Sequence, residues 1–319
     1  MRKYYVSGCL FLVLLGLIFL PIHMDPEIEE ENIASTIEAP DNTAPASAAI
    51  DAVPEVQAEP AGDISAFPSI PVLMYHILLE ERNDVISVDP LRFREQMSAL
   101  KEAGFTTITD YQLADHLRNK TKLPDKPILI TFDDGYKSVY TEAFPVLEEL
   151  GMKATVNVIA SRIFETPSTL HPEEYEKFTW PEARSMEGTV MVQAHTWDSH
   201  YKKADAENEL KGVLAGRMQD DSGLESQEEY EKRVFEDLLL SKKTIEEKMG
   251  YDVVTLAYPY GHYSEDTIRL AQVAGYQMAF TVKSGLVNRE TDAHFELDRI
   301  TADGAFSGEE LIAKIEASQ

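Results

Sequence analysis

From residue 69 onward, short apolar runs alternate with longer amphipathic segments. The short runs predict β-strands and the longer segments predict helices, because the two structures repeat with periods of about 2 and 3.6 residues. Strands are predicted at 71–75, 105–108, 127–132, 154–159, 190–194, 253–258, 277–282 and 297–301. Helices are predicted at 90–103, 111–117, 140–150, 181–186, 228–249, 264–274 and 308–317.

The alternation of strands and helices predicts the fold class. Repeated βα units produce a mainly parallel sheet, and seven or eight strands favour a barrel over an open sheet. We therefore expect an α/β fold, a distorted (β/α) barrel of seven or eight mainly parallel strands, over residues 69–319. In such a barrel the chemistry lies at the C-terminal ends of the strands.

Polar and turn-forming residues directly follow four of the predicted strands. These residues are His76, Asp133 with Asp134, His195 with His200 shortly after, and the P-Y-G turn at 259–261. Each feature alone is ordinary, because Asp-Asp-Gly is a good turn and a lone His is more often a hydrogen-bonding residue than a ligand. Their coincidence at one end of a barrel predicts an active centre.

The residue types at this end of the barrel indicate a metal site. One carboxylate and two imidazoles are a common ligand set that leaves positions for water and substrate. We assign Asp134, His195 and His200 to that role, and the adjacent Asp133 is then placed to take a proton from metal-bound water. The step from His195 to His200 is five residues, so we expect a loop around the metal rather than a helix.

Residues 1–22 predict a transmembrane signal anchor. Arg2 and Lys3 precede an uncharged, largely apolar run over residues 4–22, which is nearly long enough as a helix to span the hydrocarbon core of a bilayer. The two cations would stay in the cytoplasm and direct the rest of the chain outward. The run is not closely followed by an A-x-A-like site, which favours a retained anchor; cleavage, leaving a secreted protein, is the alternative.

Residues 23–68 differ sharply in composition from their neighbours. They are rich in Ala, Pro, Glu and Asp, contain no Lys or Arg and lack apolar periodicity, which predicts a disordered acidic tether. The formal net charge of −27 argues against nucleic acid as a partner. No protein partner is predicted, and the expected location is the extracellular face of a bacterial cytoplasmic membrane.

The motifs resemble those of the polysaccharide deacetylases, carbohydrate esterase family four, from about residue 70 to 301. The T-F-D-D-G run at 131–135 resembles the first motif, in which the first Asp is the catalytic base and the second binds metal. His195 and His200 resemble the second motif, which supplies two metal ligands. The A-Y-P-Y-G run at 257–261 resembles the third, which forms one wall of the groove. The V-L-M-Y-H run at 72–76 and F-T-W at 178–180 also match common stretches.

Two departures from the family pattern bear on the substrate and on the catalytic acid. The common pattern separates the two histidines by four positions, and the wider step here resembles the branch acting on poly-β-1,6-N-acetylglucosamine in biofilm exopolysaccharide. The late Leu-x-His motif is replaced by L-D-R at 297–299, and an Arg cannot release a proton at neutral pH. In that branch a His after the first strand supplies the acid, which implies His76.

The resemblance implies hydrolysis of the N-acetyl group of N-acetylglucosamine units. The expected cofactor is a divalent metal ion, zinc, with cobalt, nickel or iron as alternatives. Asp133 would take a proton from water, the backbone N–H of Tyr260 would help to hold the oxyanion, and His76 would protonate the leaving amine. A peptidoglycan N-acetylglucosamine deacetylase, or a non-catalytic polysaccharide-binding module on the same fold, are the alternatives.

Further contacts to substrate are assigned to residues near the motifs. These candidates are Tyr136, Trp180, Trp197, Pro259 and Arg299. Trp180 is equally well interpreted as a core residue, and Arg299 as a partner that orients Asp133. Residues 201–226 form a long polar stretch without an assigned role, and the linkage of the glycan, β-1,6 or β-1,4, stays open.

Overall fold

The computed structural model describes residues 69–168, 175–205, 207–221, 223–288 and 293–318 of the chain. The predicted anchor at 1–22 and the predicted tether at 23–68 lie outside these residues. Among the described residues, every helix is too short or too polar to cross a bilayer.

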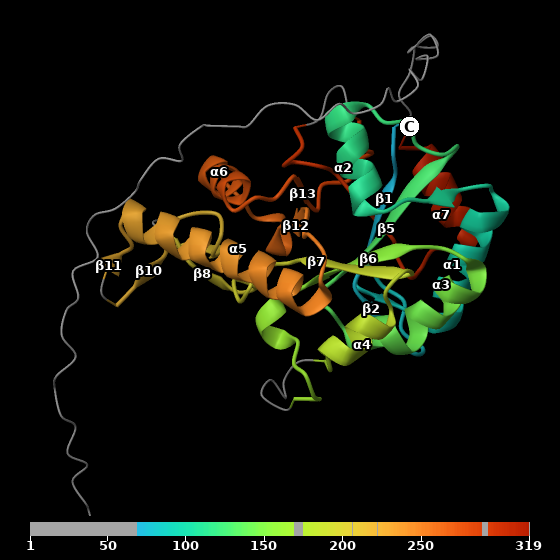
Figure 1. Cartoon of the computed structure of the whole chain (residues 1–319), viewed down its shortest axis with the longest axis horizontal. Helices are drawn as coiled ribbons and strands as arrows, with labels where there is room; N and C mark the ends of the chain where they lie inside the picture. The colour runs from blue at the N-terminus through green and yellow to red at the C-terminus, as the bar shows by residue number, and fades with distance from the viewer. Residues whose placement is uncertain (1–68, 169–174, 206, 222, 289–292, 319) are drawn as a thin grey trace, which may run out of the picture. The chain divides into compact units, whose positions relative to one another are not determined.

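Within the described residues, eight parallel strands form the central sheet, and seven of them follow one another in a continuous order (Figure 1). In spatial order they are β13 (Met278–Phe280), β12 (Thr255–Ala257), β7 (Val190–Ala194), β6 (Ala154–Val158), β5 (Pro127–Asp133), β1 (Val72–Tyr75) and β14 (Ile300–Thr301). The short β4 (Thr106–Thr107) pairs in parallel with the start of β5.

Residues 297–301 join the two edges of this sheet. The N–H of Leu297 donates to the carbonyl of Ala279 at 3.0 Å, and the carbonyl of Leu297 accepts from the N–H of Thr281 at 2.8 Å. A few residues later, β14 pairs in parallel with β1. The curled sheet therefore returns on itself, and the expected distorted (β/α) barrel is confirmed.

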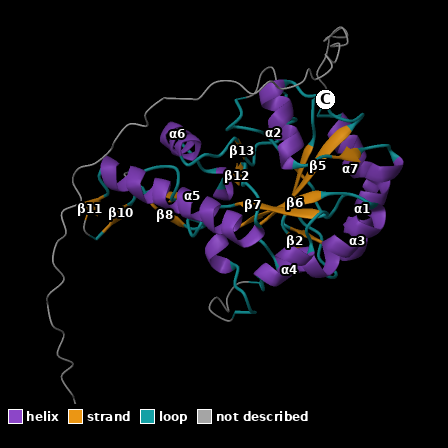
Figure 2. Ribbon diagram, viewed as in Figure 1, coloured by secondary structure: helices purple, strands orange, loops and turns teal. Residues whose placement is uncertain are grey.

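Helices surround the sheet in Figure 2. They are α1 (Pro90–Glu102), α2 (Asp110–Asn119), α3 (Phe144–Leu150), α4 (Trp180–Ser185), α5 (Gln227–Met249), α6 (Glu265–Val273) and α7 (Gly308–Glu316). A π-helical turn, η1 (Val139–Ala143), precedes α3, and two 3₁₀ turns are η2 (Ala160–Arg162) and η3 (Pro259–Gly261). The helix α1 packs against α3 and α7, whereas α5 packs against α6 and β7.

Local capping explains why the predicted helix boundaries are close to the observed ones. A Ser or Thr precedes each of α2, α4, α5, α6 and α7 and forms a reciprocal capping box with the third residue of the helix. This pairing satisfies two backbone N–H groups that the helix itself cannot use. The helix start is therefore encoded within four residues and can be recognised without the fold.

Both faces of the sheet are buried, as expected for parallel strands covered by helices. Every residue of β5 is buried. Alternate strand residues belong to two apolar clusters, with Leu73 and Ile130 in one and Val72 and Leu129 in the other. The continuous apolar run at 127–132 is therefore a strand buried on two sides.

Short strands that lack an apolar period were not predicted. The stretch at 201–226 contains two antiparallel ribbons, β8 (Lys202–Ala204) with β9 (Leu210–Gly212) and β10 (Gln219–Asp220) with β11 (Gly223–Leu224). The side chain of Arg233 on α5 donates to the carbonyls of Val213 and Gly216 and to the carboxylate of Glu225. A further parallel pair, β2 (Ile77–Leu78) with β3 (Ser87–Val88), follows β1.

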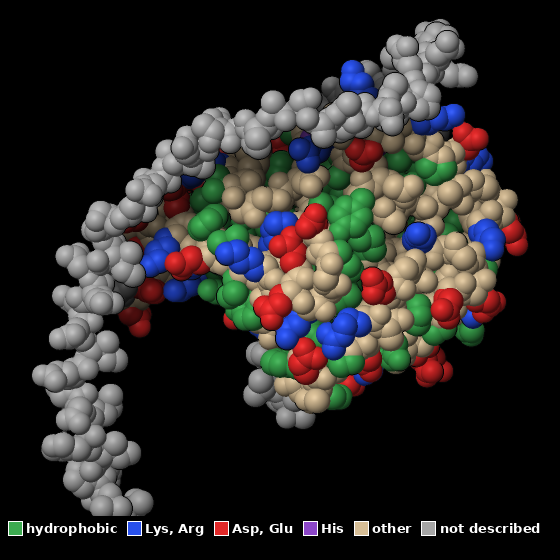
Figure 3. Space-filling model, viewed as in Figure 1, with side chains coloured by type: hydrophobic (Ala, Val, Ile, Leu, Met, Phe, Trp, Pro, Cys, Tyr) green, Lys and Arg blue, Asp and Glu red, His purple; other side chains and the backbone are tan. Residues whose placement is uncertain are grey.

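Charges of both signs are mixed on the face drawn in Figure 3. Lys and Arg side chains lie among Asp and Glu side chains over the described part of this face. Exposed pairs of this kind contribute only about 0–1 kcal/mol each. The mixture therefore bears on solubility more than on the fold.

Candidate active site

A cavity of about 320 Å³ opens at the C-terminal ends of the barrel strands. It is lined by six of the residues predicted for the active centre: His76, Asp133, Asp134, His195, His200 and Tyr260. They follow β1, β5, β7 and β12, so the parallel order of the sheet brings them to one place, as in other barrels of this type.

Three side chains in this cavity could hold a metal ion. One ligand atom from each of Asp134, His195 and His200 lies within 4.8 Å of the others. The Oδ1 atom of Asp134 is 3.4 Å from Nε2 of His195 and 3.2 Å from Nε2 of His200. Asp134 has a φ of 75°, a left-handed conformation that is costly for a side-chain-bearing residue and is typical of functional sites.

The protonation of these groups fits a cation. Nδ1 of His195 is 2.8 Å from the carbonyl of Ala257, so this nitrogen carries the hydrogen and Nε2 directs a lone pair at Asp134. Burial lowers the pKa of His195 to about 4, which keeps the imidazole neutral. Oδ1 of Asp134 is buried without a hydrogen-bond partner among the described residues. A buried carboxylate oxygen beside the lone pair of His195 matches the requirements of a metal ion.

The charge of Asp134 is also maintained by its neighbours. Burial by itself would raise the pKa of this carboxyl group, but the contacts with His200 and His195 outweigh it and hold the pKa well below its usual value. Asp134 is therefore ionised at neutral pH, as a metal ligand must be.

The second carboxylate of the cavity, Asp133, is bound by the buried side chain of Arg299. The guanidinium donates to Oδ1 at 2.9 Å and to Oδ2 at 2.8 Å, and Asn157 adds a bond to Oδ1 at 2.8 Å. Arg299 also donates to the carbonyl of Thr281 and to the hydroxyl of Thr131. Burial raises the pKa of Asp133, but the Arg299 charge outweighs it and lowers the pKa well below the usual value.

The predicted substrate contact of Arg299 is wrong, and the alternative interpretation as a partner of Asp133 is correct. The Arg299 side chain is 0% exposed, and its donors are directed at groups inside the barrel. A side chain without exposed surface cannot contact a glycan. Its position between β13 and β1 explains this burial, because residues 297–301 close the barrel there.

His76 and Tyr260 flank the two carboxylates. His76 follows β1, and its Nδ1 atom is buried without a hydrogen-bond partner among the described residues. Tyr260 has a φ of 59°, and its ring lies 4.7 Å from the ring of His200. The Tyr260 hydroxyl donates to the carbonyl of His200 at 3.1 Å, and Nζ of Lys202 lies 4.6 Å from the Tyr260 ring centre.

The aromatic candidates for sugar binding do not line this cavity. Trp180 is 2% exposed and belongs to the main core, so its predicted sugar contact is wrong and the core interpretation holds. Trp197 is partly buried against the same core. Tyr136 pairs with Lys177 across a short bridge, and Pro259 is buried at the start of η3. The contacts of Tyr136, Trp197 and Pro259 with substrate remain predictions.

The sequence reasoning missed a buried partner of Asp133 and several residues of the cavity wall. Asn157 is a lone amide within an apolar strand, and this polar interruption was the signal that could have identified it. Val85, Ile86 and Val282 form an apolar part of the cavity wall and are 55%, 45% and 41% exposed. Their sequence carried no signal, because scattered apolar surface residues are common.

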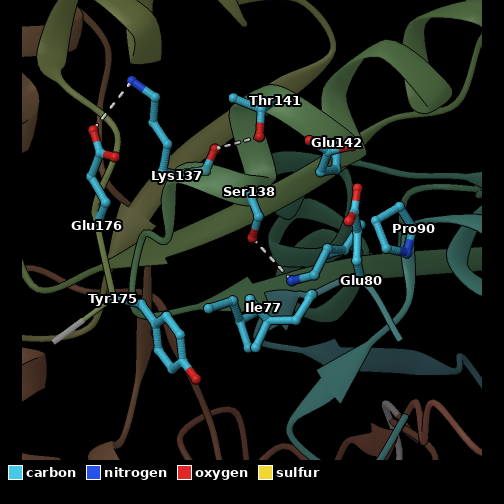
Figure 4. A pocket seen from close by; sticks show the side chains of 11 residues that line it. Ile77, Glu80, Pro90, Lys137, Ser138, Thr141, Glu142, Tyr175 and Glu176 are labelled. Carbon is cyan, nitrogen blue, oxygen red and sulfur yellow. Dashed lines mark hydrogen bonds and ion pairs between the residues drawn. The ribbon is translucent and has the colours of Figure 1, made fainter. Parts of the chain in front are cut away.

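A second cavity, of about 430 Å³, is lined by residues that follow His76 and Asp134 in the chain. Figure 4 shows Ile77, Lys137 and Ser138 on its wall, with the carboxylates of Glu80 and Glu142 nearby. The Ser138 hydroxyl accepts a hydrogen bond from the N–H of Leu78 at 3.0 Å. Two loops of the active centre therefore also form this cavity.

The chain matches known proteins over the part that carries this site. A family model described as polysaccharide deacetylase matches residues 120–279, half of the chain. The poly-β-1,6-N-acetyl-D-glucosamine N-deacetylase of Escherichia coli (strain K12) is 30% identical over 231 residues. That match covers 68% of this chain but 34% of the relative, so the chain spans about a third of the length of that protein.

Solved structures have a fold similar to that of this chain. IcaB from Ammonifex degensii is 27% identical with a TM-score of 0.63, over 77% of this chain and 96% of that chain. A de-N-acetylase from Aggregatibacter actinomycetemcomitans is 21% identical with a TM-score of 0.69, over 77% and 100%, and shows the fold alone. The family expected from the motifs is thereby confirmed: this chain belongs to the polysaccharide deacetylases.

Proposed function

We propose that this chain is a metal-dependent hydrolase that removes the acetyl group from N-acetylglucosamine units of an extracellular polysaccharide, poly-β-1,6-N-acetylglucosamine. The observation that carries the proposal is one cavity that holds two distinct carboxylates. Asp134 faces two imidazoles, whereas Asp133 is bound by a buried guanidinium. Asp134 is therefore suited to bind a metal ion, and Asp133 is suited to accept a proton.

Asp134, His195 and His200 would hold the metal. Two imidazoles and one carboxylate favour zinc, with cobalt, nickel or iron as alternatives. When bound there, the ion supplies Lewis acidity and lowers the pKa of water toward about 7. The bond of His195 to Ala257 fixes the ring orientation that such a ligand needs.

Asp133 is the proposed base. Arg299 occupies both carboxylate oxygens from the barrel side and Asn157 adds a third bond, so the carboxylate cannot rotate away from the cavity. Its lowered pKa keeps it ionised and ready to accept a proton. The same partner also limits its basicity, so that the proton is held only briefly at a carboxylate oxygen.

His76 is the proposed acid, and it lines the same cavity as Asp133. Water adds to the acetyl carbonyl carbon, and Asp133 takes its proton. The carbon–nitrogen bond then breaks while His76 delivers a proton to the amine nitrogen, which yields acetate and a glucosamine unit. The backbone N–H of Tyr260 is proposed to donate to the oxyanion, an interaction whose loss typically lowers the rate about 10²- to 10³-fold.

The proposed polymer and location rest on the relatives and on the sequence. The name of the Escherichia coli relative and the five-residue separation of His195 and His200 support poly-β-1,6-N-acetylglucosamine as the substrate. The second cavity offers room for a neighbouring sugar unit beside the loop at 134–138. Residues 1–22 are proposed to anchor the chain at the extracellular face of the cytoplasmic membrane, because of their apolar run behind two cations.

The test is acetate release by the full chain from β-1,6-linked and β-1,4-linked N-acetylglucosamine oligomers, with and without a chelator. Release from the β-1,6 oligomer that is lost on chelation and restored by zinc is expected. Release from the β-1,4 oligomer alone would contradict the proposed polymer and favour a cell-wall substrate. If neither oligomer is hydrolysed with zinc, cobalt or nickel supplied, the catalytic proposal is wrong and a binding module becomes the better account.

A further inference from the structure

The two histidines of the proposed metal site are held in different ways. His195 directly follows β7, and its ring is fixed by the carbonyl of Ala257 at 2.8 Å. His200 lies five residues further along, after a loop that has left the sheet. The position of its ring therefore depends on what holds residues 196–199, together with Tyr260, whose hydroxyl donates to the carbonyl of His200.

One side of this loop is bound by η2. The N–H of Ala160 donates to the carbonyl of Thr196, and the N–H of Ser161 donates to the carbonyl of Trp197, each at 3.0 Å. The Ser161 hydroxyl also donates to the carboxylate of Asp198 at 3.0 Å. These backbone bonds satisfy the carbonyl groups of Thr196 and Trp197, whereas the N–H groups of Trp197 and Asp198 have another acceptor.

The other side of the loop is bound by a single side chain of α5. Oδ1 of Asp237 accepts from the N–H of Trp197 at 3.0 Å, and Oδ2 accepts from the N–H of Asp198 at 2.9 Å. The Ser199 hydroxyl, one residue before His200, bonds to the same carboxylate. Two adjacent N–H groups that point the same way need two acceptor atoms, which a carboxylate offers and an amide does not.

We propose that Asp237 is a positioning residue that sets the place of His200 by holding the loop between the two histidines. This inference rests on the proposed function, because it assigns the loop a role at the metal site. The loop at 196–199 is hydrogen-bonded to η2 on one side and to α5 on the other. Within it, Thr196 has a φ of 80°. A strained non-glycine conformation persists only where the surroundings determine it.

The proposal predicts that removal of the Asp237 side chain displaces His200 but not His195. His195 keeps both its strand and its bond to Ala257, so one imidazole remains in place. His200 loses the support of the preceding loop, and its Nε2 moves from its distance of 3.2 Å to Asp134. The result would be a weaker metal site rather than an unfolded barrel, since Asp237 lies on helix α5 and not in a strand of the sheet.

The experiment is a Co²⁺ titration of the metal-free full chain, followed by visible absorption, which reports both affinity and ligand set. Asp237→Ala is expected to weaken Co²⁺ binding about 10- to 100-fold, the usual effect of losing a partner that orients a ligand. Asp237→Asn keeps one acceptor and should lie between Asp237→Ala and the unaltered chain. The matched control is Glu236→Gln on the same helix, whose side chain is 63% exposed, and it should bind as the unaltered chain does.

A purely structural role makes a different prediction. It would lower the thermal unfolding midpoint of the metal-free protein and leave the Co²⁺ affinity and spectrum of the folded protein unchanged. Under our proposal, the acetate-release rate of Asp237→Ala recovers as the metal concentration is raised, whereas a misfolded barrel would not recover. Asp237→Asn serves as the test variant if Asp237→Ala does not fold.

The outcomes separate this proposal from the proposed function. Unchanged Co²⁺ binding by both Asp237 variants overturns the positioning role and leaves the hydrolase intact. Weaker binding by the variants together with an unaltered chain that releases no acetate overturns the hydrolase and supports the positioning role. An unaltered chain that binds no Co²⁺ overturns both.

Discussion

Two aspartates are buried at opposite ends of the same barrel, and their surroundings differ. Asp133 ends β5, where Arg299 donates to both of its oxygens beside an open cavity. Asp110 begins α2 and accepts from the hydroxyl of Thr155 in β6 and, at 2.8 Å, from the hydroxyl of Thr255 at the start of β12. One carboxylate has a cation for a partner, and the other has two neutral hydroxyls.

The difference appears in the direction of the two pKa shifts. Burial raises the pKa of Asp110, because hydroxyl partners do not offset the loss of water. Burial acts on Asp133 in the same sense, but the charge of Arg299 reverses the result and lowers the pKa. Burial alone therefore does not identify a functional carboxylate. The charge of the partner and the presence of a cavity decide whether the group can take part in chemistry.

The largest expected effect is on turnover, at the C-terminal end of the barrel. Asp133→Asn should lower kcat about 10²- to 10⁴-fold, the usual contribution of a general base. Asp110→Asn should leave kcat within a few-fold of the unaltered chain, because Asp110 does not line the cavity. Steady-state acetate release measures both. Equal losses in the two variants would contradict the division of roles.

The same two substitutions should differ in stability. Asp133→Asn leaves the buried Arg299 guanidinium without its counter-charge, and breaking such a pair typically costs about 3–5 kcal/mol. Asp110→Asn replaces a carboxyl group whose raised pKa favours its neutral form, so a loss below about 1 kcal/mol is expected. Urea unfolding at neutral pH measures both free energies. A larger loss for Asp110→Asn would show that its charge, not its shape, is needed.

A smaller effect on activity is expected from altering Arg299, the partner of Asp133, than from altering Asp133 itself. Arg299→Lys loses the two-pronged contact with Asp133 and should lower kcat/KM about 10- to 100-fold, as for other orienting partners. Arg299 lowers the pKa of Asp133 through its charge and its hydrogen bonds; Lys keeps the charge but not both bonds, so the acid limb of the kcat/KM profile should move slightly to higher pH. Arg184→Lys, in an exposed pair with Glu165, is the control. An unmoved acid limb would mean that the hydrogen bonds of Arg299 do not contribute to this pKa.

The smallest effect concerns the pH dependence of stability at Asp110. Its pKa in the folded chain is raised above the unfolded value of about 3.9, so the folded state binds more protons in the window between the two. The free energy of unfolding attributable to Asp110 should therefore fall as pH rises through that window and then stay constant. Urea unfolding of the unaltered chain and of Asp110→Asn from about pH 4 to 7 measures the difference. A difference that does not change with pH would contradict the raised pKa.

Much of the fold could be predicted because its signals are local. The apolar run at 127–132 and the helix predicted at 228–249 are each recognised from neighbouring residues, and both agree with the structure. The ribbons within 201–226 were missed because their strands are two or three residues long and polar. They exist because Arg233 and buried neighbours such as Leu214 hold them against α5.

The candidate site divides in the same way. Asp134, His195 and His200 could be grouped because each follows a predicted strand, and parallel strands end at one edge. Trp180 could not be assigned by the same reasoning. Its position within the F-T-W stretch is compatible with either a sugar contact or a core residue, and only its burial in the main core decides for the core.

The sequence by itself determined the order of the barrel strands and their helices, the residues at the strand ends and the family. Periodicity and motif spacing are properties of neighbouring residues, so they can be read without the fold. The tertiary structure alone decided that Arg299 would meet Asp133, 166 residues away along the chain, and that Asp237 would meet the loop before His200. These two contacts form because the barrel closes at residues 297–301 and because α5 packs against the sheet. Periodicity indicates that one face of a strand or helix is buried, but it does not indicate which residue of another element contacts that face.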